Sequence, residues 1–264
     1  MPTDSPRRTI RIAAAGDMHF DGAARGALAD LFAAASRDAE ILVLCGDLTT
    51  HGRADQARAF LEEMAGVKIP VVTVLGNHDH EGGEVEEIAA LLTDAGVHVL
   101  DGDTVVIDGI GFAGVKGFAG GFDRGALAPF GEPLLKRFVQ EAIDEALKLE
   151  NALRALETEI RVAVLHYAPI VGTVIGEPEP IYPFLGSSRL LQPIDTIGAD
   201  VVFHGHAHHG THASETPAGI PVFNVSLPLL RADGSELFVW EASAPERRRR
   251  SDSGSGSGSG SRRG

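Results

Sequence analysis

The stretch Ile10–His19, IRIAAAGDMH, contains the pattern from which the fold can be predicted. A short apolar run ends at a glycine, and side chains that can bind a metal follow at once. The same order of features recurs at residues 41–47, ILVLCGD, and at residues 71–79, VVTVLGNHD. Apolar bursts of this length that stop at glycine or polar residues are typical of buried strands. We therefore predict three strands that each end in a polar loop.

Helical patterns separate these strands and continue after the third one, at residues 23–36, 54–65 and 84–95. Alternation of strand and helix implies parallel pairing and a sheet covered by helices. Similar short apolar runs predict further strands at residues 97–100, 104–107, 111–115, 161–166, 201–204, 222–225 and 237–241. The turns Asp101-Gly102 and Asp108-Gly109 indicate antiparallel hairpins. The predicted class is α/β, with two mixed sheets in a sandwich rather than one doubly wound sheet.

One predicted helix is much longer than the others. Residues 133–157 contain no glycine and, after Pro133, no further proline. Pro133 suits the first turn of a helix. Apolar or small residues recur at spacings of four and three, at Leu135, Val139, Ala142, Ala146, Leu149, Leu153 and Leu156. We interpret this segment as an amphipathic helix that lies on the sandwich; the alternative is a homodimer seam, because the spacing is heptad-like.

The composition is that of an ordinary folded domain. Of the 264 residues, 44% are hydrophobic and 23% are charged, enough to build a full core without general disorder. No apolar run approaches the roughly 20 residues that span a bilayer, and the N-terminal stretch lacks the core of a signal peptide. The single cysteine, Cys45, cannot form an internal disulfide, which fits a reducing compartment. We expect a cytoplasmic protein without a membrane partner.

The charge of the chain is unevenly distributed. The formal net charge is −14, but residues 246–264 hold six arginines against Glu246 and Asp252, which leaves −18 on the remainder. So acidic a body repels nucleic-acid backbones and argues against nucleic acid as a partner. The Ser/Gly-rich tail, residues 246–264, is expected to be disordered, and residues 1–8 form a short flexible arm. Residues 9–245 are then the folded domain.

Candidate metal ligands follow five of the predicted strands. Because ligands converge at the carboxyl ends of strands in α/β sheets, these side chains are expected to meet. Asp, Asn and His without cysteine suit Mn, Fe or Zn rather than a structural thiolate site. Two ions that share a bridging carboxylate would explain seven ligands, more than one ion takes. These ligands are Asp17, His19, Asp47, Asn77, His166, His206 and His208.

Substrate contacts are expected in the loops near this site. The segment 171–188 is rich in proline and glycine, follows His166, and carries Tyr182 and Phe184. These aromatic side chains either stack on a base or cover an apolar leaving group, or they complete the core. His51 either lines the cleft or lies in a solvated loop.

The ordered series GDxH, GD, GNHD, H and GHxH, spread from Gly16 to His208, resembles the calcineurin-like metallophosphoesterase superfamily. It looks most like the compact bacterial phosphodiesterase branch, in which GDL-T-x-H-G (residues 46–52 here) and GHAH also occur. The resemblance covers most of residues 10–241. It implies a four-layer α/β/β/α sandwich of two mixed sheets with a dinuclear site.

The resemblance also implies roles for individual residues. One ion would be held by Asp17, His19, Asp47 and His208. The other would be held by Asp47, Asn77, His166 and His206, so that Asp47 bridges the two. His78 corresponds to the histidine beside the scissile phosphate that binds no ion, and Asp79 resembles the carboxylate that orients it.

The implied activity is hydrolysis of small phosphodiesters, with nucleotides or cyclic nucleotides as candidate substrates. A metal-bridging hydroxide would attack phosphorus in line, and His78 would stabilise or protonate the leaving oxygen. Two divalent or trivalent transition-metal ions, Mn, Fe or Zn, would be the cofactors. The alternatives are a DNA or RNA nuclease and a non-catalytic scaffold that binds proteins on the same fold.

Overall fold

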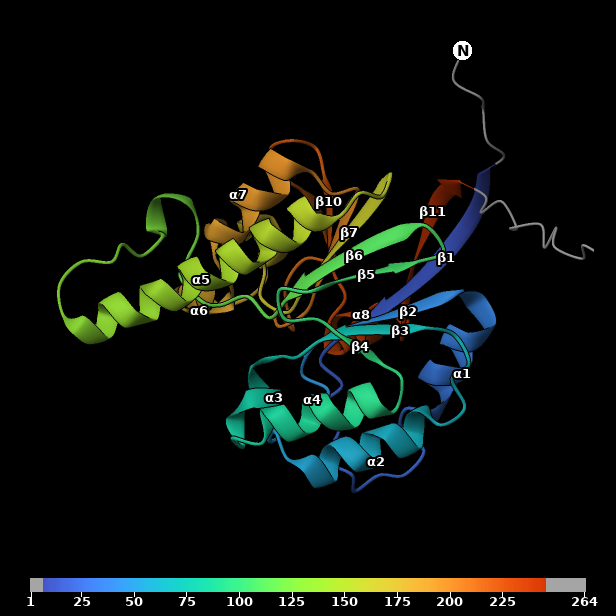
Figure 1. The fold of residues 1–264 in the computed structure, drawn as a ribbon. Helices are drawn as coiled ribbons and strands as arrows, with labels where there is room; N and C mark the ends of the chain where they lie inside the picture. Colours follow the sequence, from blue (N-terminus) through green and yellow to red (C-terminus); the bar gives the residue numbers. More distant parts are fainter. Residues whose placement is uncertain (1–6, 246–264) are drawn as a thin grey trace, which may run out of the picture.

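The computed structural model describes residues 7–245, which form two sheets packed face to face (Figure 1). The first sheet has the strand order β11-β1-β2-β3-β4 and the second β5-β6-β7-β8-β10-β9. The strands of the first sheet are β1 (Arg7–Ala15), β2 (Ile41–Cys45), β3 (Val71–Val74), β4 (His98–Val99) and β11 (Phe238–Pro245). Those of the second are β5 (Thr104–Ile107), β6 (Ile110–Val115), β7 (Ile160–Leu165), β8 (Val201–His204), β9 (Ala213–Glu215) and β10 (Pro221–Asn224).

Both sheets are mixed, as predicted. β1 pairs with β11 in the antiparallel sense, whereas β1, β2, β3 and β4 run parallel to one another. In the second sheet β6, β7, β8 and β10 are parallel, and β5 and β9 form antiparallel edges. The carboxyl ends of the parallel strands therefore lie together along one edge of each sheet.

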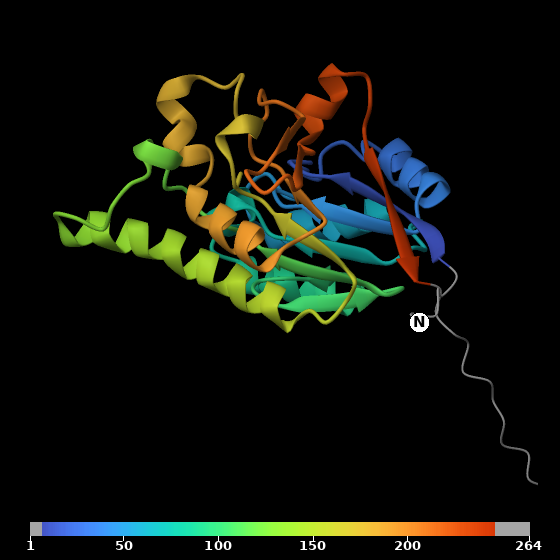
Figure 2. The ribbon, with the colours of Figure 1, turned by 90° about the horizontal axis from the view of Figure 1, so that it is seen from above.

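Helices cover the outer face of each sheet, which confirms the four-layer α/β/β/α sandwich (Figures 1 and 2). Three helices pack on the first sheet: α1 (Ala29–Asp38), α2 (Ala54–Met64) and α4 (Val85–Asp94). Two pack on the second: α5 (Pro133–Ala155) and α7 (Ser188–Ile197). Alternate strand residues divide between the layers, since Leu42 faces the helices whereas Val43 faces the other sheet.

Short helices occupy the loops around this framework. They are α3 (Asn77–Glu81), α6 (Tyr182–Leu185) and α8 (Leu227–Ala232), with 3₁₀ turns at Asp123–Gly125, Val171–Thr173 and Glu179–Ile181. The segment 171–188, predicted as a loop, thus contains regular turns. None of the helices within residues 7–245 combines the length and apolarity needed to cross a bilayer.

Two predictions about chain connections need correction. Arg7 and Arg8 belong to β1 and pair with β11, so they are not part of a flexible arm. The rest of that arm and the tail, residues 1–6 and 246–264, lie outside the described residues. Asp108-Gly109 does form a hairpin, between β5 and β6. Asp101-Gly102 does not, because β4 pairs with β3 in the first sheet and the chain then crosses to the second.

The long helix α5 begins at Pro133, as predicted, and its regular apolar stripe packs inside its own chain. Leu149 and Leu153 are fully buried among side chains of β6, β7 and α7. The predicted homodimer seam therefore cannot use these residues. The first turns of α5 extend beyond the sheets in Figure 2, and Leu134 there is 71% exposed. Dimerisation through this helix stays a prediction and would have to use that end.

Candidate metal centre

The predicted ligands come together where strands of both sheets end. Asp17 follows β1, Asp47 follows β2, Asn77 follows β3 and His166 follows β7. Two sets of three residues bring their ligand atoms within 4.8 Å of one another. One set is Asp17, His19 and His208, and the other is Asp47, His166 and His206.

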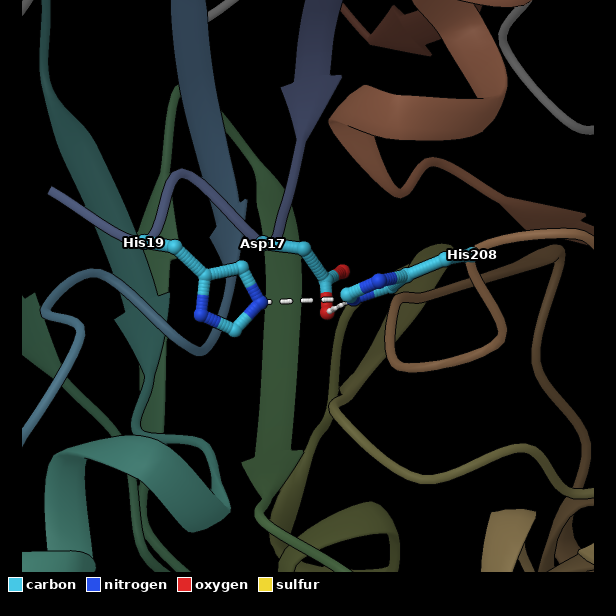
Figure 3. A group of neighbouring side chains, drawn as sticks. All are labelled: Asp17, His19 and His208. Carbon is cyan, nitrogen blue, oxygen red and sulfur yellow. Dashed lines mark hydrogen bonds and ion pairs between the residues drawn. The ribbon is translucent and has the colours of Figure 1, made fainter.

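In the first set, the His208 ring lies between the Asp17 carboxylate and the His19 ring and contacts both (Figure 3). His208 Nε2 lies 3.0 Å from Asp17 Oδ1 and 3.3 Å from His19 Nε2. The hydrogen bond to Asp17 raises the pKa of His208, whereas burial lowers the pKa of His19. Two imidazole nitrogens and a buried carboxylate that point at one position are the donor set of a transition-metal site.

The second set is oriented by its surroundings. His166 Nδ1 lies 2.8 Å from the Cys45 carbonyl oxygen, which only accepts, so this nitrogen carries the proton. His166 Nε2 is thereby turned toward Asn77 Oδ1 at 2.8 Å and Asp47 Oδ2 at 3.4 Å. A ligand histidine held through its other nitrogen by a backbone carbonyl is the usual arrangement in metal sites. Burial lowers the pKa of His206 to about 4, which leaves its imidazole neutral.

Asp47 connects the two sets. Its Oδ2 lies 3.4 Å from His166 Nε2 and 3.7 Å from His19 Nε2, and its Oδ1 accepts a hydrogen bond from the His78 amide at 2.8 Å. Burial by itself raises the pKa of Asp47, but His166 and the hydrogen bonds outweigh it and hold this pKa below its usual range. An ionised carboxylate between two groups of histidines fits a bridging ligand. The donor set therefore suits two ions.

The backbone is strained at the ligands. Positive φ angles occur at Asp17 (59°), His19 (43°), Asp47 (51°) and His206 (71°). In the described part of the chain only two other non-glycine residues have positive φ, so the strain is concentrated here. Strained residues of this kind persist where the surrounding structure fixes a functional geometry.

Two glycines make room for the carboxylates. A side chain at Gly76 would collide with Asp47 Oδ1, and one at Gly205 would collide with Asp17 Oδ2. Gly76 has φ −104°, an angle open to any residue. The space beside Asp47, rather than the backbone angle, therefore requires glycine at this position.

His78 lies beside the ligands with a fixed orientation. Its Nδ1 donates to the Thr50 carbonyl oxygen at 2.7 Å, and its ring centre lies 4.5 Å from that of His19. The side chain is 38% exposed, so it can contact a molecule in solution. His78 also forms a set with His19 and Asp47 whose ligand atoms lie close enough to hold a metal. Metal analysis of a His78 variant therefore distinguishes a ligand from a residue that contacts only the substrate.

Asp79 does not orient the His78 imidazole, contrary to our prediction. It is the third residue of α3, and its carboxylate turns back to the start of that helix, where free amides attract it. It accepts hydrogen bonds from the amides of Gly76, Leu48 and Thr49 and from the Thr49 hydroxyl. Among the described residues, the Thr50 carbonyl takes the place at His78 that we predicted for Asp79.

The predicted substrate contacts divide into two groups. His51 lies on the rim, 62% exposed and 3.5 Å from Glu81. Phe184 is 60% exposed, and its carbonyl oxygen lies 3.2 Å from His206 Nε2, so it borders the site. Tyr182 packs against a small apolar cluster that includes Leu185, as the core interpretation expected.

Three residues near the site escaped prediction from the sequence. Thr50 holds His78 through its carbonyl and donates its hydroxyl to the His19 carbonyl at 2.5 Å. Tyr167 packs its ring 4.4 Å from that of His206, between centres. Lys116 accepts at its carbonyl oxygen from the His166 amide. Thr50 lies within the motif at residues 46–52 and Tyr167 follows His166, so their positions in the sequence could have indicated a place near the site. No motif includes or adjoins Lys116.

The layered sandwich gathers oxygen and imidazole side chains at the ends of its strands, and these are the donors of a transition-metal site. The family model for calcineurin-like phosphoesterases matches residues 10–210, and the chain belongs to this family. Its members are metal-dependent phosphoesterases with a dinuclear metal centre. The chain is accordingly a hydrolase that acts on phosphoesters.

Solved structures share the fold at low sequence identity. A phosphopantetheinyl hydrolase from Mycobacterium tuberculosis has a TM-score of 0.59 at 16% identity, over 88% of this chain and 95% of the other. The protein TT1561 of Thermus thermophilus has a TM-score of 0.55 at 15% identity, over 89% of this chain and 99% of the other. GAP50 of Plasmodium, an anchor in the inner membrane complex, has a TM-score of 0.52 at 11% identity, over 90% of this chain and 79% of the other. No curated protein matches the chain.

Proposed function

We propose that the protein is a dinuclear phosphodiesterase that hydrolyses small phosphodiesters, with nucleotides or cyclic nucleotides as candidate substrates. The observation that carries this proposal is the position of Asp47 Oδ2 between His166 Nε2 (3.4 Å) and His19 Nε2 (3.7 Å). One carboxylate within reach of two sets of histidines is what a pair of neighbouring ions requires.

The ligands divide between the two ions as the sets do. Asp17, His19, Asp47 and His208 would hold one ion, and Asp47, Asn77, His166 and His206 the other. Mn, Fe or Zn suits these donors. When bound, two such cations lower the pKa of a water molecule and neutralise the phosphoryl oxygens.

His78 is the residue that we assign to the leaving group. Its Nδ1–H is engaged by the Thr50 carbonyl, so Nε2 is the nitrogen free to contact substrate. As the phosphorus–oxygen bond breaks, His78 in its imidazolium form would transfer the Nε2 proton to the departing oxygen and be left neutral, and the proton lost by the attacking water would restore it. Water supplies the hydroxyl that replaces the departing oxygen, and the products are a phosphomonoester and an alcohol.

The charge of the chain and the residue at the rim favour a small substrate. The charge of −18 outside residues 246–264 disfavours nucleic acid, and the metal ions rather than arginines would neutralise a phosphoester. Phe184 lies at the rim with an exposed ring that can cover a base. Cys45 is buried in β2, and burial raises the pKa of its thiol well above the ordinary value, so it is an unreactive core residue.

Metal analysis together with a substrate panel tests the proposal. Protein stripped of metal and reloaded with Mn, Fe or Zn should bind close to two ions per chain and cleave bis(p-nitrophenyl) phosphate. Asp47→Asn should weaken binding of both ions and remove most activity, whereas Asp103→Asn, an exposed residue of the β4–β5 crossing, should change neither.

Several outcomes would contradict the proposal. Two tightly bound ions and near wild-type turnover in Asp47→Asn would contradict the bridging role. Cleavage of p-nitrophenyl phosphate or single-stranded DNA in preference to small diesters would contradict the substrate class. A native protein that binds no metal would support the scaffold alternative.

A further inference from the structure

Lys116 is a cationic residue beside the metal centre to which the proposed mechanism gives no role. It directly follows β6, and its carbonyl oxygen accepts hydrogen bonds from the amides of His166 (3.1 Å) and Tyr167 (3.0 Å). The parallel pairing of β6 with β7 therefore fixes Lys116 next to a candidate metal ligand.

The Lys116 side chain lines a cavity of about 290 Å³. The walls come from α3, α4 and the segment that crosses from β4 to β5. Leu75, Val85 and Leu100 provide apolar surface, and His80, Glu86 and Asp101 add polar groups, two of which are carboxylates. A concave apolar site with a few polar groups is the usual form of a small-molecule pocket.

The ammonium of Lys116 keeps hydrogen-bonding capacity for a ligand. Its Nζ donates to the Gly117 carbonyl at 2.8 Å and lies 4.9 Å from the centre of the Phe118 ring. Among the described residues this is its one hydrogen bond, and none of their carboxylates lies within 4.0 Å of it. An ammonium has three donors, so two are free.

The nearby acids are held by a different lysine. Lys148 Nζ lies 2.8 Å from Glu145 Oε1 and 2.8 Å from Asp101 Oδ1. The other Glu145 oxygen accepts from the Gly117 amide at 2.7 Å. Burial lowers the pKa of Lys116, and Glu145 opposes this shift. The acids thus favour the charged form of Lys116 without pairing with it.

Lys116 and the candidate ligand His206 both lie beside the Tyr167 ring. Lys116 Nζ lies 5.6 Å from the Tyr167 ring centre, which lies 4.4 Å from the His206 ring centre. The ammonium is therefore no more than about 10 Å from a candidate metal ligand. A nucleoside can span such a distance between a phosphodiester and a second phosphate.

We propose that Lys116 and this cavity form a subsite for a second anionic group, a terminal phosphate, on the phosphodiester substrate. The inference rests on the proposed function, because it describes part of the molecule that the metal centre would cleave. The apolar wall takes the portion of the substrate between the two phosphates, and the free donors of Lys116 bind the terminal one.

A pair of matched substrates tests the subsite. Thymidine 5′-(p-nitrophenyl phosphate) is compared with the same ester carrying a 3′-phosphate, and kcat/KM is measured for each with metal-loaded protein. We expect the 3′-phosphate to raise kcat/KM about tenfold, which corresponds to about 1.4 kcal/mol. Lys116→Met should bring the ratio of the two values close to one. Lys136→Met, the same loss of charge at an exposed position of α5, should keep the ratio.

The outcomes separate this inference from the function on which it rests. If both esters are cleaved but the wild type shows no preference, or Lys116→Met retains it, the subsite is wrong and the proposed function stands. If neither ester is cleaved, the proposed function fails. Calorimetry then compares thymidine 3′,5′-bisphosphate with thymidine 5′-phosphate, and equal affinity for wild type and Lys116→Met would refute the subsite. Lys116→Gln replaces the Met variant if the latter does not fold.

Discussion

Replacement of Asp79 by asparagine distinguishes a structural role for this carboxylate from a role in orienting His78. Asp79 is fully buried. One of its oxygens accepts from the Thr49 amide (2.9 Å) and hydroxyl (2.7 Å), and the other from the amides of Gly76 (2.9 Å) and Leu48 (3.2 Å). An asparagine can present one oxygen only, so two of the four donors would face an NH₂ group.

The size of the effect follows from these contacts. A hydrogen bond to a charged acceptor contributes about 1.5–3 kcal/mol, so two lost bonds cost about 3–6 kcal/mol. Removal of a buried charge offsets part of this loss, since burial raises the pKa of Asp79 and so disfavours its ionised form. We expect Asp79→Asn to lower the free energy of unfolding by about 3 kcal/mol, a large share of the typical 5–15 kcal/mol.

Urea unfolding of the metal-free protein measures this change without a contribution from bound ions. Thr49→Val tests the same contacts from the donor side: it removes the hydroxyl that donates to Asp79 and accepts from the Gly52 amide, and it should cost about 1.5–3 kcal/mol. Turnover of alkoxide and nitrophenolate esters by Asp79→Asn should fall by the same factor, because the loop that carries Asp47 is disturbed. If the free energy of unfolding is unchanged and turnover falls only for alkoxide esters, the reasoning is refuted and Asp79 acts by orienting His78.

Three further predictions follow from the site and the core. His78→Ala should leave the metal content intact and lower the turnover of esters with an alkoxide leaving group by about 10²–10⁴-fold, with a much smaller loss for esters of p-nitrophenol. Metal analysis and kinetics with both kinds of ester check this prediction. Loss of metal from the variant would make His78 a ligand. Leu149→Ala should lower the free energy of unfolding, measured by urea titration, by about 2–5 kcal/mol, because the fully buried Leu149 side chain packs against the second sheet. Leu134→Ala, at an exposed position, should change this free energy little. Small and equal effects of the two substitutions would contradict the packing of α5. Burial lowers the pKa of His166, but Asp47 outweighs burial and raises it to about 9, so the metal-free protein should lose stability as the pH rises from about 7.5 to 9. In this window His204 and His206, whose pKa in the folded protein is about 4, are almost entirely neutral in both the folded and the unfolded state. A rise in stability measured by urea unfolding over this range would contradict the His166–Asp47 pairing.

The layers of the fold could be predicted because they depend on local patterns. The apolar bursts of β1, β2 and β3 end at glycine, and such a pattern is typical of strands buried on both faces. Turn chemistry was less informative. Asp101-Gly102 and Asp108-Gly109 have the same residues, yet one crosses between sheets and the other closes a hairpin. A dipeptide specifies a change of direction and not which strands pair.

That the candidate ligands lie close together could be predicted from the motifs, but the groups that orient them could not. The Thr50 carbonyl at His78 and the Cys45 carbonyl at His166 are backbone atoms, which every residue has. The side chain of Asp79 was misassigned because neighbours in sequence need not touch; on α3 its carboxylate turns toward the start of the helix. Positive φ at Asp17 and Asp47 likewise depends on the assembled site and not on local preference.

The antiparallel pairing of β1 with β11 has a consequence for handling the protein. Arg7 lies opposite Pro245, so the chain enters and leaves the first sheet at the same place (Figure 1). Asp17 lies at the other end of β1, roughly 30 Å away at 3.3 Å per strand residue. A tether attached through either end would hold the enzyme with its metal centre facing free solution, so immobilised protein should keep its turnover. A short linker between the same two points would permit circular permutation, with new ends at the Asp108-Gly109 hairpin.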